Sequence, residues 1–66
     1  MNNWIQVQDE LPPRGLIVDV KIDDELGCRN ETKLKLGRDP SRLWWTPDGE
    51  MYIYYTPTHW KYCEEN

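Results

Sequence analysis

Apolar and polar residues alternate along several stretches of the chain, and this pattern predicts β-strands. In residues 16–22, leucine, valine, valine and isoleucine occupy every second position, with aspartate and lysine among the residues between them. A period of two with β-branched side chains is typical of a strand that buries one face. The predicted core-facing row is Leu16, Val18, Val20 and Ile22.

Residues 31–36 alternate in the same way and predict a second strand. The two lysines, Lys33 and Lys35, fall on its polar face. Charged side chains also suit the edge of a sheet, because charge discourages pairing with another chain. Shorter apolar or aromatic stretches predict four further strands, over residues 4–7, 43–46, 51–56 and 58–62.

Proline, glycine and aspartate separate these strands. The two prolines in residues 11–15 fix φ and lack a backbone donor, so this stretch is a turn or a polyproline segment. The polar residues 23–30 predict a hairpin loop, and 37–42 predict another connection. The Pro-Asp-Gly sequence in residues 47–50 has the residues that a tight turn requires.

Five or six short strands with frequent turns predict a mainly β fold. We expect a small antiparallel meander, an open roll or a small barrel. A chain of 66 residues makes one domain at most, which we place at residues 1–63 with a frayed tail at 64–66. A domain of this size buries only about 60% of the surface that its unfolded chain exposes, so its stability is marginal without large core side chains.

Large side chains are present, since the chain has four tryptophans and four tyrosines but no phenylalanine. Each such ring can bury roughly 150–250 Å². They predict a core built from a few large side chains. Trp and Tyr are also enriched among the residues that dominate binding interfaces, so some of these rings are expected to form a recognition surface.

Charge and hydropathy exclude several classes of protein. The net charge of −4 argues against general nucleic-acid binding, which normally needs a basic surface, and against attachment to anionic membranes. No apolar run approaches the ~18 residues of a membrane-spanning helix. Met1 is followed by two asparagines rather than by a secretory signal, so we expect a cytoplasmic protein.

The residues that support catalysis or metal binding are few. Cys28 and Cys63 are expected to be free thiols in the cytoplasm, and with His59 they give three soft donors where structural zinc takes four. His59 is the one histidine and Ser41 the one serine, which leaves no evident catalytic triad. We therefore expect neither an enzyme nor a metal or cofactor site.

Charge is distributed unevenly along the chain. Residues 19–31 are mainly acidic, and residues 33–42 are mainly basic. These blocks are either two solvated faces of an ordinary domain or patches that guide a charged partner into place.

Both ends of the chain carry a pattern that resembles a known family. The N-terminal part reads Trp4-Ile5-x-Val7-x-x-x-Leu11-Pro12, and Thr58-His59-Trp60 lies near the C-terminus. This is similar to a family of small phage and prophage proteins with an uncharacterised domain, whose members continue after the last tryptophan with M-P-L-P. Here Lys61-Tyr62-Cys63 follows instead. The resemblance implies a phage or prophage origin and carries no activity.

The same residues also have a structural interpretation. Trp4 and Trp60 lie near opposite ends of the chain, and we expect them to pack together and join those ends. Leu11 and Pro12 would then hold the first turn over this cluster.

Three functions are compatible with the sequence. The first is a phage accessory protein that binds a host protein and modulates it by inhibition. Its candidate contacts are Trp44, Tyr52, Tyr54, Arg38 and Arg42. The alternative is an oligomeric protein that sequesters a small nucleotide signal of host defence, with rings stacked on a base and the two arginines on phosphates. A weaker alternative is single-stranded nucleic-acid binding.

Overall fold

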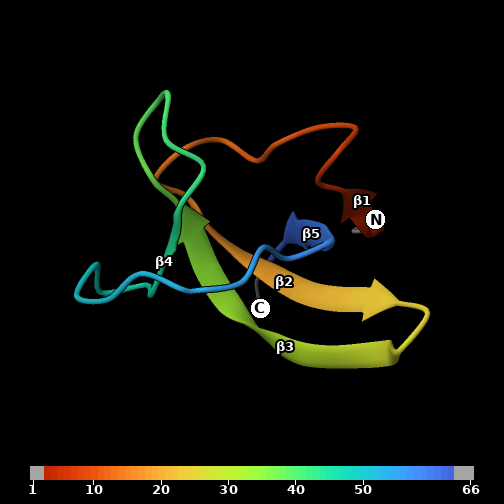
Figure 1. Ribbon diagram of the computed structural model, residues 1–66. Helices are drawn as coiled ribbons and strands as arrows, with labels where there is room; N and C mark the ends of the chain where they lie inside the picture. Colours follow the sequence, from red (N-terminus) through yellow and green to blue (C-terminus); the bar gives the residue numbers. More distant parts are fainter. Residues whose placement is uncertain (1–2, 64–66) are drawn as a thin grey trace.

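The computed structural model describes residues 3–63, which form one open antiparallel sheet of five strands and no helix. The tail expected at 64–66 lies outside these residues. The strands are β1 (Ile5–Gln6), β2 (Ile17–Asp24), β3 (Gly27–Leu36), β4 (Trp44–Trp45) and β5 (His59–Tyr62). Their order in the sheet is β1-β5-β2-β3-β4 (Figure 1). The predicted mainly β fold is confirmed, and of the alternatives the sheet is open rather than closed into a barrel.

The β2–β3 hairpin is the longest element, and it extends further than the sequence predicted. Only Glu25 and Leu26 form its turn, so most of the loop expected at 23–30 belongs to the two strands. Asp24 accepts a hydrogen bond from the backbone N–H of Leu26, and its carboxylate pairs with Arg29 at 2.8 Å. This arm of the hairpin is exposed on both faces, so its strands lack the apolar alternation of a buried strand.

A β-bulge bends the hairpin near its middle. Val20 faces Thr32 and Ile22 faces Arg29, so β3 contains one residue more than β2 between these pairs. Asn30 lies in the bulge with a φ of 57°. Asparagine tolerates this left-handed region better than most residues, which allows the extra residue to be accommodated.

The core lies on one face of the sheet. It consists of Val18, Val20, Leu34, Leu36, Trp44 and Trp60. The alternation in residues 16–22 is thus confirmed for its two valines and for Ile22, which is also buried. Leu16 is the exception, since it precedes β2 and is 42% exposed.

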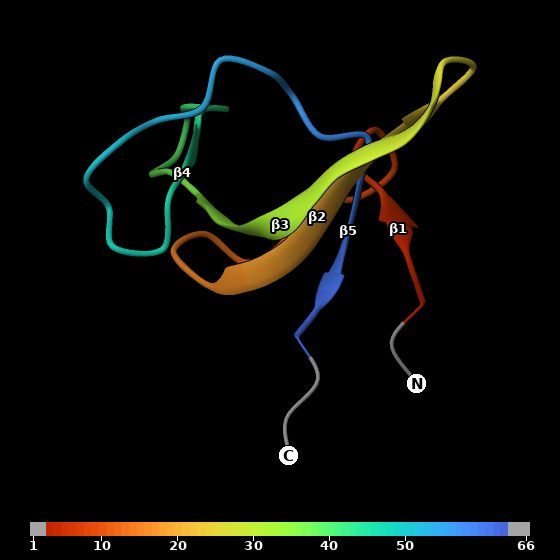
Figure 2. The same ribbon diagram turned by 90° about the horizontal axis from the view of Figure 1, so that it is seen from below.

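Strand β5 lies between β1 and β2 and joins distant parts of the chain (Figure 2). Trp60 pairs with Ile5 on one side and with Val20 on the other. Its indole Nε1–H donates to the carbonyl of Glu10 at 2.7 Å, and Leu11 packs against the core beside it. Leu11 thus packs against the core that contains Trp60, and not over a cluster of Trp4 and Trp60 as expected.

The expected packing of Trp4 against Trp60 is wrong. Ile5 shares the core face with Trp60, and successive residues of an extended chain point to opposite faces. Trp4 therefore lies on the other face, where its ring receives the ammonium groups of Lys21 at 4.5 Å and Lys61 at 4.8 Å.

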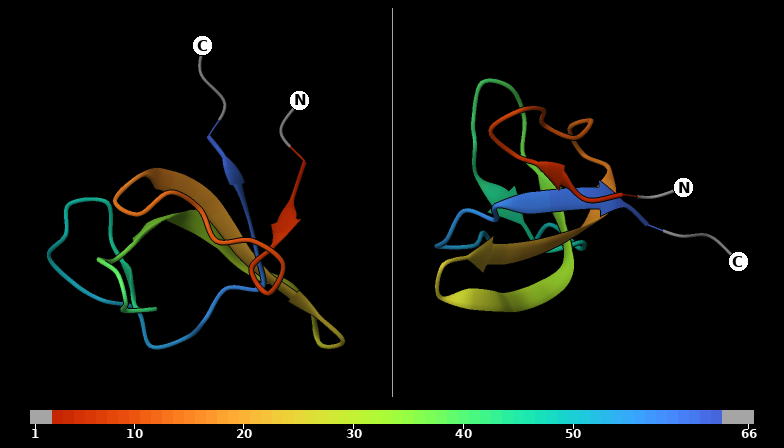
Figure 3. Two further views of the ribbon diagram at one scale, coloured as in Figure 1. Left: turned by 90° about the horizontal axis from the view of Figure 1, so that it is seen from above. Right: turned by 90° about the vertical axis from the view of Figure 1, so that its right-hand side faces the viewer.

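The strand expected over residues 51–56 is also wrong. Tyr52 forms an isolated bridge to Trp45, and the chain then leaves the sheet. In Figure 3 the chain leaves the sheet after β4 and returns to it at β5. β4 has only two residues and offers too short an edge for a longer pairing. The tight turn predicted at 47–50 is present, with Gly49 at a φ of 77°.

Among the described residues, no helix has the length and apolar character needed to cross a membrane.

Candidate functional site

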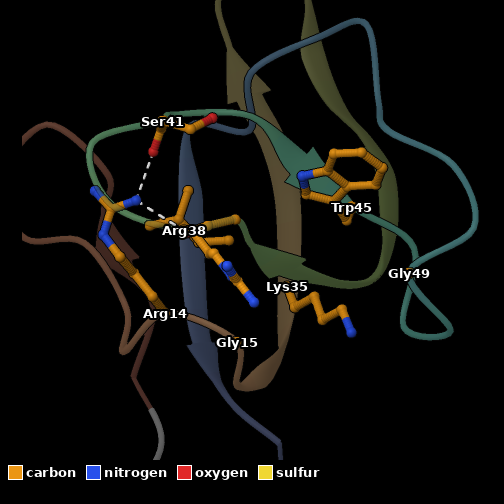
Figure 4. Close-up of a pocket in the computed structure, with 9 residues that line it drawn as sticks. Arg14, Gly15, Lys35, Arg38, Ser41, Trp45 and Gly49 are labelled. Atoms are coloured by element: carbon orange, nitrogen blue, oxygen red, sulfur yellow. Dashed lines mark hydrogen bonds between the residues drawn. The ribbon is translucent and has the colours of Figure 1, made fainter.

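An open pocket of about 660 Å³ lies where β3 ends and β4 begins. Its volume is within the range of small-ligand sites. Figure 4 shows the residues around it, which come from the Arg14–Gly15 turn, the end of β3, the 37–42 connection and β4. Its charged and aromatic members are Arg14, Lys35, Arg38 and Trp45.

Arg14 holds the wall of this pocket together. One guanidinium nitrogen donates to the carbonyls of Gly37 at 2.9 Å and Ser41 at 2.5 Å (Figure 4). The other terminal nitrogen lies 3.7 Å from the carboxylate of Asp39. Arg14 thereby fixes the 37–42 connection against the first loop. The sequence analysis missed this role, because an arginine after two prolines gives no local sign of a contact more than twenty residues away.

Lys35 and Arg38 bring further positive charge to the pocket. Within residues 3–63 neither forms an ion pair. The Lys35 ammonium extends over the 47–50 turn, close to Gly49. The pKa of Asp48 in this turn is lowered, first by the hydrogen bond from the Thr46 hydroxyl, then by the Glu50 N–H, and to a smaller extent by the charge of Lys35.

Three aromatic rings run outward from the pocket and form what we call the aromatic ladder, Trp45, Tyr52 and Tyr54. The centroids of Trp45 and Tyr52 are 5.8 Å apart, and those of Tyr52 and Tyr54 are 6.1 Å apart, both in edge-to-face geometry. Tyr52 is 51% exposed and Tyr54 is 95% exposed. The ladder therefore links the pocket to a ring that is almost entirely in solvent.

Trp44 is not a surface contact, contrary to the sequence-based prediction. It is 2% exposed and belongs to the core, whereas Trp45 lines the pocket. Consecutive residues of β4 point to opposite faces, so only one of the two tryptophans can face inward. The prediction named the wrong member of the Trp-Trp pair, because pairing with β3 decides which of the two rings faces the core.

Arg38 and Arg42, which were expected to act together, lie in different places. Arg42 lines a second pocket of about 440 Å³ together with Asp23, Thr58 and His59. There the Nδ1 of His59 lies 2.7 Å from the Thr58 hydroxyl. Within one chain the two arginines therefore line different pockets, and the lysine that lines the first pocket with Arg38 is Lys35.

The aspartates of the acidic block pair with nearby cations, whereas Lys33 is the one cation of the basic block that forms an ion pair within residues 3–63. Asp19 binds Lys33 across β2 and β3 at 2.7 Å, which raises the pKa of Lys33. Lys21 lies 3.3 Å from Asp23. Most of the charge on the hairpin is thus matched locally, and Lys35 and Arg38 at the pocket stand apart from this pattern.

Both cysteines are free thiols in the structure. Cys28 is exposed, and the Sγ of Cys63 lies 3.6 Å from the Lys33 Nζ and 3.7 Å from an oxygen of Asp19. No group of three His, Cys, Asp or Glu residues within 3–63 is placed to hold a metal ion.

The geometry supplies a contact surface of aromatic rings and a pocket of hydrogen-bond donors, side by side. Such a surface suits binding, because rings provide contact area and fixed cations provide orientation. Comparisons of the chain with models of protein families, with curated proteins and with solved structures found no match.

Proposed function

We propose that this chain is a non-catalytic accessory protein that binds a partner protein through the aromatic ladder and inhibits it. The observation that carries the proposal is the exposure of Tyr52 and Tyr54, which continue a line of ring contacts begun by Trp45. Tyrosine and tryptophan contribute large, rigid contact areas, and they dominate the energetics of many interfaces.

The residues around the ladder indicate which chemical groups a partner would carry at the interface. Met51, which precedes Tyr52 in sequence, is 63% exposed. Lys35 and Arg38 lie at the inner end of the ladder. A partner with an apolar patch bordered by acidic side chains would complement both features, and its charges would set the orientation of docking.

The resemblance at the two ends of the chain to small phage and prophage proteins favours a host protein as the partner. Inhibition suits a protein of this kind, since a domain of 66 residues can cover a functional surface without any chemistry of its own. We place single-stranded nucleic acid lower, because Lys21, Arg29 and Lys33 are engaged by carboxylates rather than arranged as a track for phosphates.

The test is a pull-down from bacterial lysate with the tagged chain, analysed by mass spectrometry. Three proteins are compared: the natural sequence, the double variant Tyr52→Ser/Tyr54→Ser, and the control Leu26→Ser. Leu26 is 81% exposed in the β2–β3 turn, so the control removes an equally accessible apolar side chain at a different place. Circular dichroism of each variant checks that the sheet is intact.

We expect one host protein at near-equal stoichiometry with the natural chain and with Leu26→Ser. It should be absent with the double variant. Retention of the same protein by a folded double variant would show that the ladder is not the contact surface. Loss with Leu26→Ser would point to the hairpin turn instead.

A further inference from the structure

The lysines and arginines of this chain differ in whether they form ion pairs. Of its eight lysines and arginines, four form ion pairs within residues 3–63: Arg14, Lys21, Arg29 and Lys33. Two of the remaining four, Lys35 and Arg38, line the same pocket. The chain has twelve Asp and Glu residues, yet these two cations of one pocket have no ion-pair partner within residues 3–63. This combination distinguishes the site.

The carboxylates near the pocket contact residues other than Lys35 and Arg38. Asp39 lies in the ion pair with Arg14. Asp48 accepts hydrogen bonds from the Thr46 hydroxyl and from the Glu50 N–H, with Lys35 acting on it only through a weaker charge interaction. The positive charge in the pocket is therefore not cancelled by direct contact with the acids that surround it.

Trp45 adds a third donor to the same pocket. Its indole Nε1–H has no acceptor among residues 3–63, whereas the corresponding group of Trp60 donates to Glu10. Nε1 of Trp45 packs directly against Gly37, where a Cβ atom would lie only 2.8 Å away. Because residue 37 has no side chain, the indole nitrogen lies close against the backbone at the start of the 37–42 connection.

These groups share one chemical property. The ammonium of Lys35, the guanidinium of Arg38 and the indole N–H of Trp45 are hydrogen-bond donors with no acceptor capacity. Donors of this kind are complementary to the oxygen atoms of a phosphate, and a guanidinium binds such oxygens with particular strength. The pocket also has apolar lining from Leu36 and the ring of Trp45, so it has room for more than an ion.

We infer that this pocket binds a nucleotide, with the phosphate on Lys35 and Arg38 and the base against Trp45. The volume of about 660 Å³ fits a ligand of mononucleotide size. The inference goes beyond the proposed function, because it concerns a small ligand inside the pocket rather than a protein on the exposed ladder. Trp45 is the residue that both sites share.

The first measurement is a titration of ¹⁵N-labelled protein, followed by two-dimensional NMR, with AMP, adenosine and inorganic phosphate. AMP should shift the indole N–H signal of Trp45 and the backbone signals of residues 35–38 in a saturable manner. Adenosine, which has no phosphate, should bind at least tenfold more weakly. No saturable shift of these signals with AMP would overturn the inference, as would adenosine binding equal to that of AMP. Inorganic phosphate binding as tightly as AMP would also overturn it, by showing that the base makes no contact.

Charge variants locate the site. Arg38→Gln and Lys35→Gln should each weaken AMP binding by about tenfold, which corresponds to the loss of about 1.4 kcal/mol. Arg42→Gln and Lys61→Gln are matched controls, because they remove cations that form no ion pair within residues 3–63 and lie outside this pocket. Equal weakening by the controls would indicate non-specific attraction and overturn the inference. Tyr54→Ser should leave AMP binding intact, which separates this test from that of the protein partner.

Discussion

Replacing Trp60 with phenylalanine removes an indole N–H that donates to the Glu10 carbonyl at 2.7 Å and reduces the volume of a side chain that is 0% exposed. This hydrogen bond is only partly buried, and its loss should cost about 1 kcal/mol. The unfilled volume between β1, β5 and β2 adds roughly 1–2 kcal/mol. The expected loss in the free energy of unfolding is therefore about 2–3 kcal/mol.

This loss is large for so small a domain. Proteins have roughly 0.05–0.15 kcal/mol of stability per residue, which gives about 3–10 kcal/mol for this chain. A change of 1 kcal/mol shifts the melting temperature of a domain of this size by about 4–8 °C, so Trp60→Phe should lower it by roughly 10–20 °C. Thermal unfolding followed by circular dichroism, together with urea denaturation, measures both quantities.

Trp45→Phe is the matched control for this measurement. It makes the same chemical change at a tryptophan that is only partly buried and whose Nε1–H has no acceptor among residues 3–63. We expect it to cost less than about 1 kcal/mol. If the two variants lost equal stability, the central role of Trp60 in joining the first loop to the sheet would be refuted.

Two further predictions concern the pocket and the turn beside it. Gly37→Ala places a Cβ atom 2.8 Å from the indole Nε1 of Trp45 and 3.2 Å from the Leu43 carbonyl, so it should displace the indole and cost about 1–3 kcal/mol. Urea denaturation and the fluorescence spectrum would test this, and unchanged values for both would contradict it. The hydrogen bond from the Thr46 hydroxyl lowers the pKa of Asp48 below its usual 3.8, so its contribution to stability is present above that pH and is lost as the pH falls through the lowered pKa. Asp48→Asn should therefore melt at a lower temperature than the natural chain at pH 6, and the two should converge toward pH 2; a constant difference over this range would show that the carboxylate charge is not involved.

The sequence predicts the fold best where a strand has one buried face. In β2 and at the end of β3 the alternation of apolar and polar residues directly reflects which side chains reach the core, as for Val18 and Leu34. The distal part of the β2–β3 hairpin is exposed on both faces, so it reads as a polar loop although it pairs as a strand.

The remaining errors have a common physical origin, since each depends on what lies across the sheet. Residues 51–56 alternate like a strand, but β4 is too short to pair with them beyond Tyr52. Trp44 and Trp45 are equivalent in sequence until pairing with β3 decides which one faces inward. The pocket could not be predicted for the same reason, because Arg14 joins it through contacts with a loop that is remote in sequence.

The position of β5 between β1 and β2 has a consequence for the folding rate. Ile5 and Val20 both pair with Trp60 of β5. Each pairing therefore requires two segments that are far apart in the sequence to meet, which closes a long loop. Contacts of such long range must overcome loop-closure entropy before they contribute energy, and small β-proteins built on them fold in milliseconds to seconds rather than in microseconds. Until β5 arrives, the β2–β3 hairpin keeps one edge of its most apolar strand unpaired, and this edge is the surface through which incompletely folded chains would associate.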